Sequence, residues 1–136
     1  MEKSQKPYLV VIHLVERANA LTVMSTLKTF ITNDQILIPT DVCRTTWDRI
    51  HGLMGKHHYE RALLIPRCNS VHTFFMRFPI DVAFLDRNLV VLDVVRMAPW
   101  RIRYPRLRAR SVLEAEIGYF DKWQIYPSVQ LSYDQQ

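Results

Sequence analysis

Residues 71–86 of the chain read VHTFFMRFPIDVAFLD and are its most distinctive stretch. Apolar and aromatic side chains dominate this stretch, which is typical of strands that pack on a hydrophobic core. Pro79 interrupts the pattern, because a proline has no N–H to donate to a strand ladder. We therefore expect a strand over 71–77, a corner at Pro79 and a second strand over 81–85.

The segments on either side of this stretch also predict short strands. The turn residues at 86–88 separate two apolar runs, which is a hairpin signal leading into a strand over 89–97. The run over 21–32 favours a strand but also fits one face of a helix. Further strands are predicted over 9–15, 36–38, 62–65, 112–117 and 129–133. Short strands at close spacing predict a mainly β domain, an antiparallel sandwich or barrel of jelly-roll-like form.

One packed helix is predicted near residues 41–54. Thr40 or Asp41 can cap its first turn, since a short side-chain oxygen accepts an otherwise unpaired N–H. Gly52 and Gly55 supply its end. Four residues recur at the spacing of one helical face, namely Cys43, Trp47, Ile50 and Met54.

The size and composition of the chain predict one domain over residues 1–136. Hydrophobic residues make up 49% and charged residues 23%, which is ordinary for a globular protein. The cysteines Cys43 and Cys68 form no CxxC pair, so we expect reduced thiols in a cytoplasmic protein. No apolar run approaches the roughly 20 residues of a membrane helix, and we expect no signal peptide.

Two motifs in the chain resemble those of a known family. Residues 47–55 read WDRIHGLMG, and residues 68–86 read CNSVHTFFMRFPIDVAFLD; PWR at 99–101 and SVLE at 111–114 with Gly118 follow in order. Over about residues 36–133 the chain is similar to the domain-of-unknown-function family 192. The resemblance implies a compact β-sandwich or jelly-roll-like fold with one packed helix, and residues 1–35 are then a divergent N-terminal β extension. It implies no activity, because the family is uncharacterised.

Four polar residues are candidates for a ligand site near the 71–86 segment: His72, Arg77, Asp81 and Glu114. One hypothesis is a pocket for a small anion or a peptide, in which Asp81 holds Arg77. The alternative is a buried Arg77–Asp81 ion pair that only stabilises a strand corner, because buried charges need partners. A further alternative is a small hydrolase in which His72 and Asp81 act as acid and base.

Metal and cofactor sites are not predicted. Cys68 and His72 have the spacing of a ligand pair on a helix, but this segment reads as loop and strand. His57 and His58 are adjacent and outside a helix, so we interpret them as a solvated turn.

The segment 98–110 interleaves arginines with aromatic residues and contains no acid. Arginine neutralises phosphates and aromatic rings stack on bases, so this loop is a candidate for binding single-stranded nucleic acid. The residues that would do so are Trp100, Arg101, Arg103, Arg106 and Arg108. Alternatively, the loop is pinned to the core and its arginines form a solvated face.

These patterns favour a non-enzymatic domain that binds an anionic ligand or a protein partner near residues 71–86. The net charge of +5 favours anionic partners without identifying one. The hydrolase based on His72 and Asp81 and the nucleic-acid surface over 98–110 are the alternatives.

Overall fold

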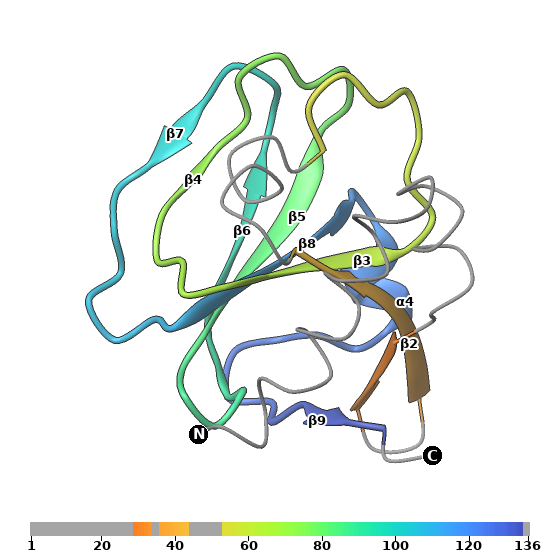
Figure 1. Ribbon diagram of the computed structural model, residues 1–136, viewed down its shortest axis with the longest axis vertical. Coiled ribbons are helices and arrows are strands. Elements are labelled where there is room, and N and C mark those ends of the chain that lie inside the picture. The colour runs from red at the N-terminus through yellow and green to blue at the C-terminus, as the bar shows by residue number, and fades with distance from the viewer. Residues whose placement is uncertain (1–28, 34–35, 44–52, 135–136) are drawn as a thin grey trace, which may run out of the picture.

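The computed structural model describes residues 29–33, 36–43 and 53–134 of the chain, and this part is mainly β (Figure 1). Apolar, β-branched residues dominate the longer strands, as the sequence predicts. The elements are β1 (Thr29–Asn33), β2 (Ile36–Val42), β3 (Ala62–Pro66), β4 (Val71–His72), β5 (Ile80–Leu85), β6 (Val91–Met97), β7 (Ile102–Arg103), β8 (Ser111–Glu116), α4 (Tyr119–Lys122) and β9 (Ser132–Tyr133).

Seven of the strands form one mixed sheet in the order β6-β5-β8-β3-β2-β1-β9. The expectation of a purely antiparallel sheet is wrong at one position, because β2 and β3 pair in parallel. A parallel pair needs a crossover connection rather than a tight turn, and residues 43–61 supply it here. The mainly β prediction is confirmed.

The described strands do not close this sheet into a barrel. The chain just before β9 runs beside the start of β6, where the Val91 N–H donates to the Val129 carbonyl and the Ser128 N–H to the Val91 carbonyl, each at 2.8 Å. The two edges are thus bridged at one end by a loop, without a continuous ladder. The jelly-roll arrangement stays a prediction.

Both faces of the sheet are covered in the described part of the chain. All six residues of β5 are buried, which is typical of a strand with packed side chains on each side. Alternate residues of β3 enter different clusters, Leu64 on one face and Leu63 on the other. We call these the α4 cluster and the ribbon-side cluster.

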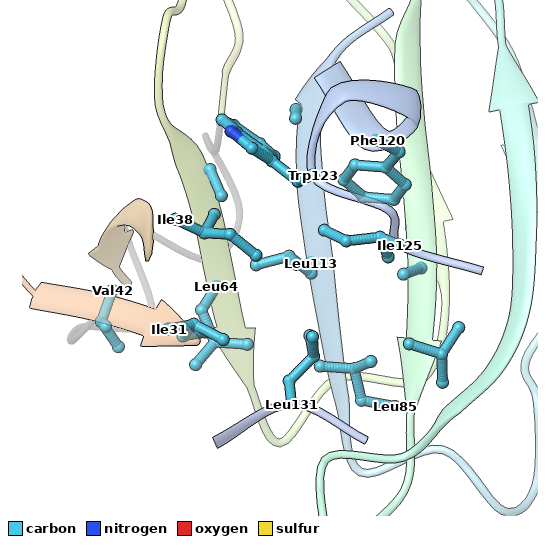
Figure 2. Close-up of a cluster of buried hydrophobic side chains, with 14 residues drawn as sticks. Ile31, Ile38, Val42, Leu64, Leu85, Leu113, Phe120, Trp123, Ile125 and Leu131 are labelled. Carbon is cyan, nitrogen blue, oxygen red and sulfur yellow. The ribbon is translucent and has the colours of Figure 1, made fainter. Parts of the chain in front are cut away.

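The α4 cluster fills the space between the sheet and the segment around α4. Figure 2 shows Phe120 and Trp123 lying over the sheet beside Ile125 and Leu113. The ribbon-side cluster holds the side chains that follow β4 in the sequence, including Met76 and Phe78. Each such buried side chain contributes about 1.5–3 kcal/mol relative to an exposed one, so both clusters hold the fold together.

The predicted strand over 71–77 is wrong beyond His72. The chain leaves the strand conformation at Thr73, whose N–H donates to the Arg101 carbonyl at 2.8 Å and whose carbonyl accepts from the Trp100 N–H at 2.8 Å. β4 therefore pairs with β7 in a two-stranded antiparallel ribbon, separate from the large sheet. Figure 1 shows this ribbon at one margin of the molecule. Its second strand, β7, lies within the segment 98–110, which was predicted to be an irregular loop.

The predicted start of the helix is also wrong. Thr40 and Asp41 belong to β2, which continues through Pro39 opposite Phe30. The Thr40 hydroxyl donates to the Ile38 carbonyl at 2.9 Å instead of capping a helix. At the predicted end of the helix, residues 53–54 form a turn. Residues 44–52 of the predicted helix and the strand predicted over 9–15 lie outside the described residues.

Of the run predicted over 21–32, the described end lies in β1, and residues 21–28 lie outside the described part of the chain. The other strand predictions that fall on described residues agree with the structure to within a few residues, and the hairpin between β5 and β6 is confirmed. The Asp86 carboxylate closes that hairpin by accepting hydrogen bonds from the Asn88 and Val90 N–H groups. α4 is a single turn that was not predicted. Within the described residues, no helix is long and apolar enough to cross a membrane.

Candidate functional site

The four predicted ligand residues do not form one site. Asp81 is in register with Ala115, and its carboxylate meets Phe120, so it belongs to the α4 face of the sheet. Glu114 is in register with Leu63 and therefore belongs to the opposite face. Successive strand residues point to opposite faces, which accounts for this separation.

Asp81 is buried and holds the start of α4. Its Oδ2 accepts hydrogen bonds from the Gly118 N–H at 2.9 Å and the Phe120 N–H at 3.4 Å, and Arg96 Nε lies 3.6 Å from Oδ1. Burial raises the pKa of Asp81, while the two backbone hydrogen bonds and Arg96 act in the opposite direction. Both carboxylate oxygens of Asp81 thus have partners within the fold, which indicates a structural role.

Arg77 and His72 have other partners. The expected Arg77–Asp81 pair is not formed, because Arg77 is exposed and its Nη1 lies 3.4 Å from His57 Nε2. His72 Nδ1 accepts a hydrogen bond from the Phe74 N–H at 3.3 Å. Between the described residues His72 and Asp81 there is no hydrogen bond, so they do not form the acid–base pair of the hydrolase hypothesis.

Glu114 is a buried acid in apolar surroundings, flanked by Leu63 of β3 and Val82 of β5. Burial raises the pKa of Glu114 to about 8, and no charged or hydrogen-bonding group of the described chain offsets this effect. The side chain is therefore protonated at neutral pH, and it does not act as a fixed negative charge.

A polar cluster on the same face as Glu114 was not predicted. Asp41 accepts hydrogen bonds from Tyr59 Oη at 2.5 Å and from Arg61 Nε at 3.0 Å. Glu116 accepts from the Tyr59 N–H at 3.2 Å and lies 2.9 Å from His58 Nδ1, and this contact raises the pKa of His58. The cluster ties the segment before β3 to β2 and β8. No group of residues in the described part of the chain has the arrangement of a metal site.

Arg106 also has a structural role, unlike its predicted role in nucleic-acid binding. Its Nη2 lies 2.9 Å from Asp93 Oδ2, and its guanidinium lies over the Phe84 ring at 5.4 Å. Arg106 is thus held against β5 and β6 by an ion pair and a cation–π contact.

The remaining residues of the arginine-rich loop meet the 71–77 segment. Val71 pairs with Arg103, and His72 pairs with Ile102. The Thr73 hydroxyl accepts from the Arg101 N–H at 2.8 Å. Two stretches that were separate candidates in the sequence therefore form one surface. We call it the ribbon surface, and it consists of His72, Phe74, Phe75, Trp100, Arg101 and Arg103.

Aromatic rings gather at the tip of this surface. Phe75 lies 4.7 Å and Phe74 6.2 Å from the Trp100 ring, between centroids, and His72 stacks on Phe74 at 5.1 Å. Phe75 is 60% and Trp100 55% exposed. Large contiguous apolar groups on a surface mark an interaction site more often than a stability element.

The backbone at this tip is strained. Phe75 and Trp100 have φ values of 62° and 64°, a left-handed conformation that bulky side chains rarely adopt. The strain is held by the Thr73 hydrogen bonds and by the Gly55 N–H, which donates to the Phe75 carbonyl at 3.1 Å. Such strain persists where the surrounding structure fixes it, and it clusters at functional sites.

Phe74 and Phe75 were not predicted as site residues, because a strand over 71–77 would bury one of them on each face. Their adjacency carried a signal: consecutive bulky rings beside Thr73 and a nearby proline also fit an exposed turn. The pairing of Asp81 with Arg96 had no signal in sequence spacing.

Fold and surface together define a small, mainly β domain with an exposed ribbon of aromatic and cationic residues. The chain belongs to the DUF192 family, described as uncharacterized ACR, whose family model matches residues 29–133. The resemblance seen in the motifs is thereby confirmed, and the match begins before residue 36, where it was predicted to start.

Two archaeal relatives carry the family's uncharacterised names. The chain is 45% identical over 75 residues to UPF0127 protein PH1112 of Pyrococcus horikoshii, covering 52% of this chain and 65% of the relative. It is 36% identical over 86 residues to a UPF0127 protein of Thermococcus sibiricus, covering 59% and 56%. The matched part thus spans less than two thirds of the length of these two relatives.

Two solved structures have a similar fold. A protein of unknown function from Novosphingobium aromaticivorans matches with a TM-score of 0.65 at 17% identity, covering 78% of this chain and 84% of its own. A Sinorhizobium meliloti protein described as a candidate transcription regulator matches with a TM-score of 0.68 at 15% identity, covering 78% and 92%. At these identities the likeness concerns the fold alone, and the family indicates no specific function.

Proposed function

We propose that this chain is a non-enzymatic domain that binds nucleic acid through the ribbon surface. The observation that carries the proposal is the pairing of β4 with β7, because it joins exposed aromatic rings to arginines that have no acidic neighbours in the sequence. Arginines beside exposed rings are the combination that nucleic-acid surfaces use.

The charge of this region supports an anionic partner. Residues 67–80 and 94–113 together contain eight arginines and no Asp or Glu. The ion pairs of two of them, Arg96 and Arg106, are with acids outside these segments. A surface without internal acids attracts phosphate groups over a distance of about 10 Å at ordinary salt.

Several of these arginines have donors available for a ligand. Arg101 and Arg103 of the ribbon surface and Arg108 beyond it are exposed, and none forms an ion pair within the described chain. A guanidinium offers planar paired donors that match two phosphate oxygens, and it remains charged at any physiological pH.

The other hypotheses have less support. A pocket for a small anion needs His72, Arg77, Asp81 and Glu114 on one surface, whereas Asp81 and Glu114 lie on opposite faces of the sheet. The hydrolase needs His72 beside Asp81, whose oxygens are already engaged by Gly118, Phe120 and Arg96.

Fluorescence anisotropy with a labelled oligonucleotide of mixed sequence tests the proposal, using single-stranded and duplex probes at about 50 and 200 mM salt. With about three phosphate contacts, we expect binding at the higher salt to be weaker by roughly 20-fold for the single strand and roughly 40-fold for the duplex. The double variant Arg101→Gln/Arg103→Gln should lower the slope of log affinity against log salt by about one to two units.

The matched control removes the same charge elsewhere, as Arg87→Gln/Lys122→Gln. Arg87 lies in the β5–β6 hairpin, and Lys122 lies in α4 on the other face of the sheet, so binding should change little. The absence of salt-dependent binding to either probe would overturn the proposal. Equal competition by polyglutamate of the same charge would overturn it as well, since it would identify an acidic polypeptide as the ligand.

A further inference from the structure

We infer that the ribbon surface takes single-stranded rather than duplex nucleic acid, with unpaired bases stacked on Phe75 and Trp100. This inference rests on the proposed function and names the ligand class of the same surface. Its evidence is the arrangement of the exposed rings, which charge alone does not require.

The rings form a continuous row along the tip. His72 contacts Phe74, Phe74 contacts Trp100, and Trp100 contacts Phe75, at centroid separations of 5.1, 6.2 and 4.7 Å. Phe75 and Trp100, at the end of this row, are the most exposed of the three large rings. Every base presents a flat π face, so such a row accepts successive bases without regard to their sequence.

The row is fixed before a ligand binds. The Trp100 N–H and the Met76 N–H both donate to the Thr73 carbonyl, at 2.8 and 3.3 Å. The Phe75 carbonyl accepts from Gly55 at 3.1 Å. The left-handed backbone conformation at Phe75 and Trp100 directs two bulky side chains to the surface, although this conformation costs free energy at each residue. A preformed site loses less entropy on binding than a flexible loop does.

Phosphate contacts come from the arginines that flank the rings. Arg101 follows Trp100 directly, and its Nη1 donates to the Trp100 backbone carbonyl at 3.3 Å, so the guanidinium is held to the backbone of the residue that carries the ring. Arg103 lies two residues further along the chain, in β7. In a duplex the bases are paired and stacked on one another, and their faces are closed to these rings.

The test compares a labelled single strand of about ten nucleotides with the same sequence as a duplex. We expect the single strand to bind about tenfold more tightly than the duplex, and Phe75→Leu or Trp100→Leu to remove most of that preference. The salt slope should stay unchanged in both variants, because the rings carry no charge. Tyr126→Ala removes an exposed ring outside the ribbon surface and should have no effect.

Tryptophan fluorescence gives a readout of stacking itself. The single strand should quench the wild-type emission, and Trp100→Phe should abolish most of the quenching while it keeps most of the affinity, since a phenyl ring remains. Loss of quenching in this variant also excludes the other two tryptophans, Trp47 and Trp123, as its source.

The outcomes separate this inference from the proposed function. Equal affinity for single strand and duplex, with salt-dependent binding retained, would overturn the inference and leave the proposed function standing. Quenching that persists in Trp100→Phe would overturn the stacking assignment. The absence of binding to either probe would overturn both. Circular dichroism of each variant identifies any that fail to fold. If Trp100→Leu does not fold, the loss of preference is tested by Phe75→Leu and stacking on Trp100 by the quenching in Trp100→Phe.

Discussion

Thr73 and Arg101 are joined by two hydrogen bonds of 2.8 Å, from the Thr73 N–H to the Arg101 carbonyl and from the Arg101 N–H to the Thr73 hydroxyl. The same hydroxyl donates to the Ala98 carbonyl at 2.7 Å. Thr73 is completely buried, so these bonds replace water around several backbone groups. Through these bonds Thr73 turns the 71–77 segment away from a strand conformation. The same bonds hold β4 and β7 together.

Replacing Thr73 with valine should therefore destabilise the protein. Valine has nearly the same shape but no hydroxyl, so the Arg101 N–H and the Ala98 carbonyl lose a partner in a buried place. We expect the free energy of unfolding in urea to fall by about 1–3 kcal/mol. The control Ser70→Ala changes an exposed hydroxyl next to the ribbon, and its unfolding curve should match that of the wild type. Equal stability of the two variants would show that the Thr73 hydroxyl is not needed.

The exposed rings should contribute little to stability, in contrast to the buried ones. Phe75→Gly loses a ring contact with Trp100, worth about 0.5–1.5 kcal/mol, but relieves a left-handed backbone that costs about 1–3 kcal/mol. The net change in the free energy of unfolding should stay within about 1 kcal/mol. Phe78→Ala, at a buried position, should cost about 3–5 kcal/mol. A large loss in Phe75→Gly would mean that Phe75 is retained for the fold.

Asp81 should be needed for the packing of α4. Asp81→Ala leaves the Gly118 and Phe120 N–H groups without their acceptor beneath α4, so we expect a loss of about 1–3 kcal/mol in urea unfolding. Asp121→Ala is the matched control, because that carboxylate is 61% exposed and pairs with the same Arg96. An exposed pair contributes about 1 kcal/mol or less. Equal losses in the two variants would contradict the role assigned to Asp81.

The sequence predicted most of the strands, because they depend on local patterns. Residues 62–65 and 81–85 are largely apolar runs bounded by turn residues, and 112–117 is a segment of apolar residues with two glutamates that ends at Gly118. Each lies within a residue or two of an observed strand. The hairpin at Asp86 was predictable for the same reason. Its side chain closes the turn within a few residues of its own position.

The parts of the fold that were not predicted depend on contacts between residues far apart in the sequence. Thr73 leaves the strand because of Arg101, which is 28 residues away. β2 continues past Pro39 because β1 and β3 flank it on either side. The candidate residues Asp81 and Glu114 both looked like site residues, and only the register of β5 with β8 separates them onto opposite faces. Sequence spacing carries none of this information.

Glu114 makes the stability of the protein depend on pH in a specific direction. Its pKa is about 8 in the folded protein and near the ordinary 4.5 in the unfolded chain. Between these values the folded state binds more protons than the unfolded state, so the free energy of unfolding falls as the pH rises, by up to about 1.4 kcal/mol per pH unit.

Glu114→Gln should remove this dependence, because glutamine stays neutral at every pH. Urea unfolding at about pH 5, 6, 7 and 8 should give a variant that gains stability relative to the wild type with each step. Groups such as His58 titrate in both proteins, so the difference between the two curves isolates Glu114. Glu116→Gln is a contrasting variant, because it removes the partner that raises the pKa of His58. Its difference curve should rise only above the ordinary His pKa of 6.5, whereas that of Glu114→Gln should rise already from about pH 5. Parallel profiles for wild type and Glu114→Gln would mean that Glu114 ionises normally in the folded protein.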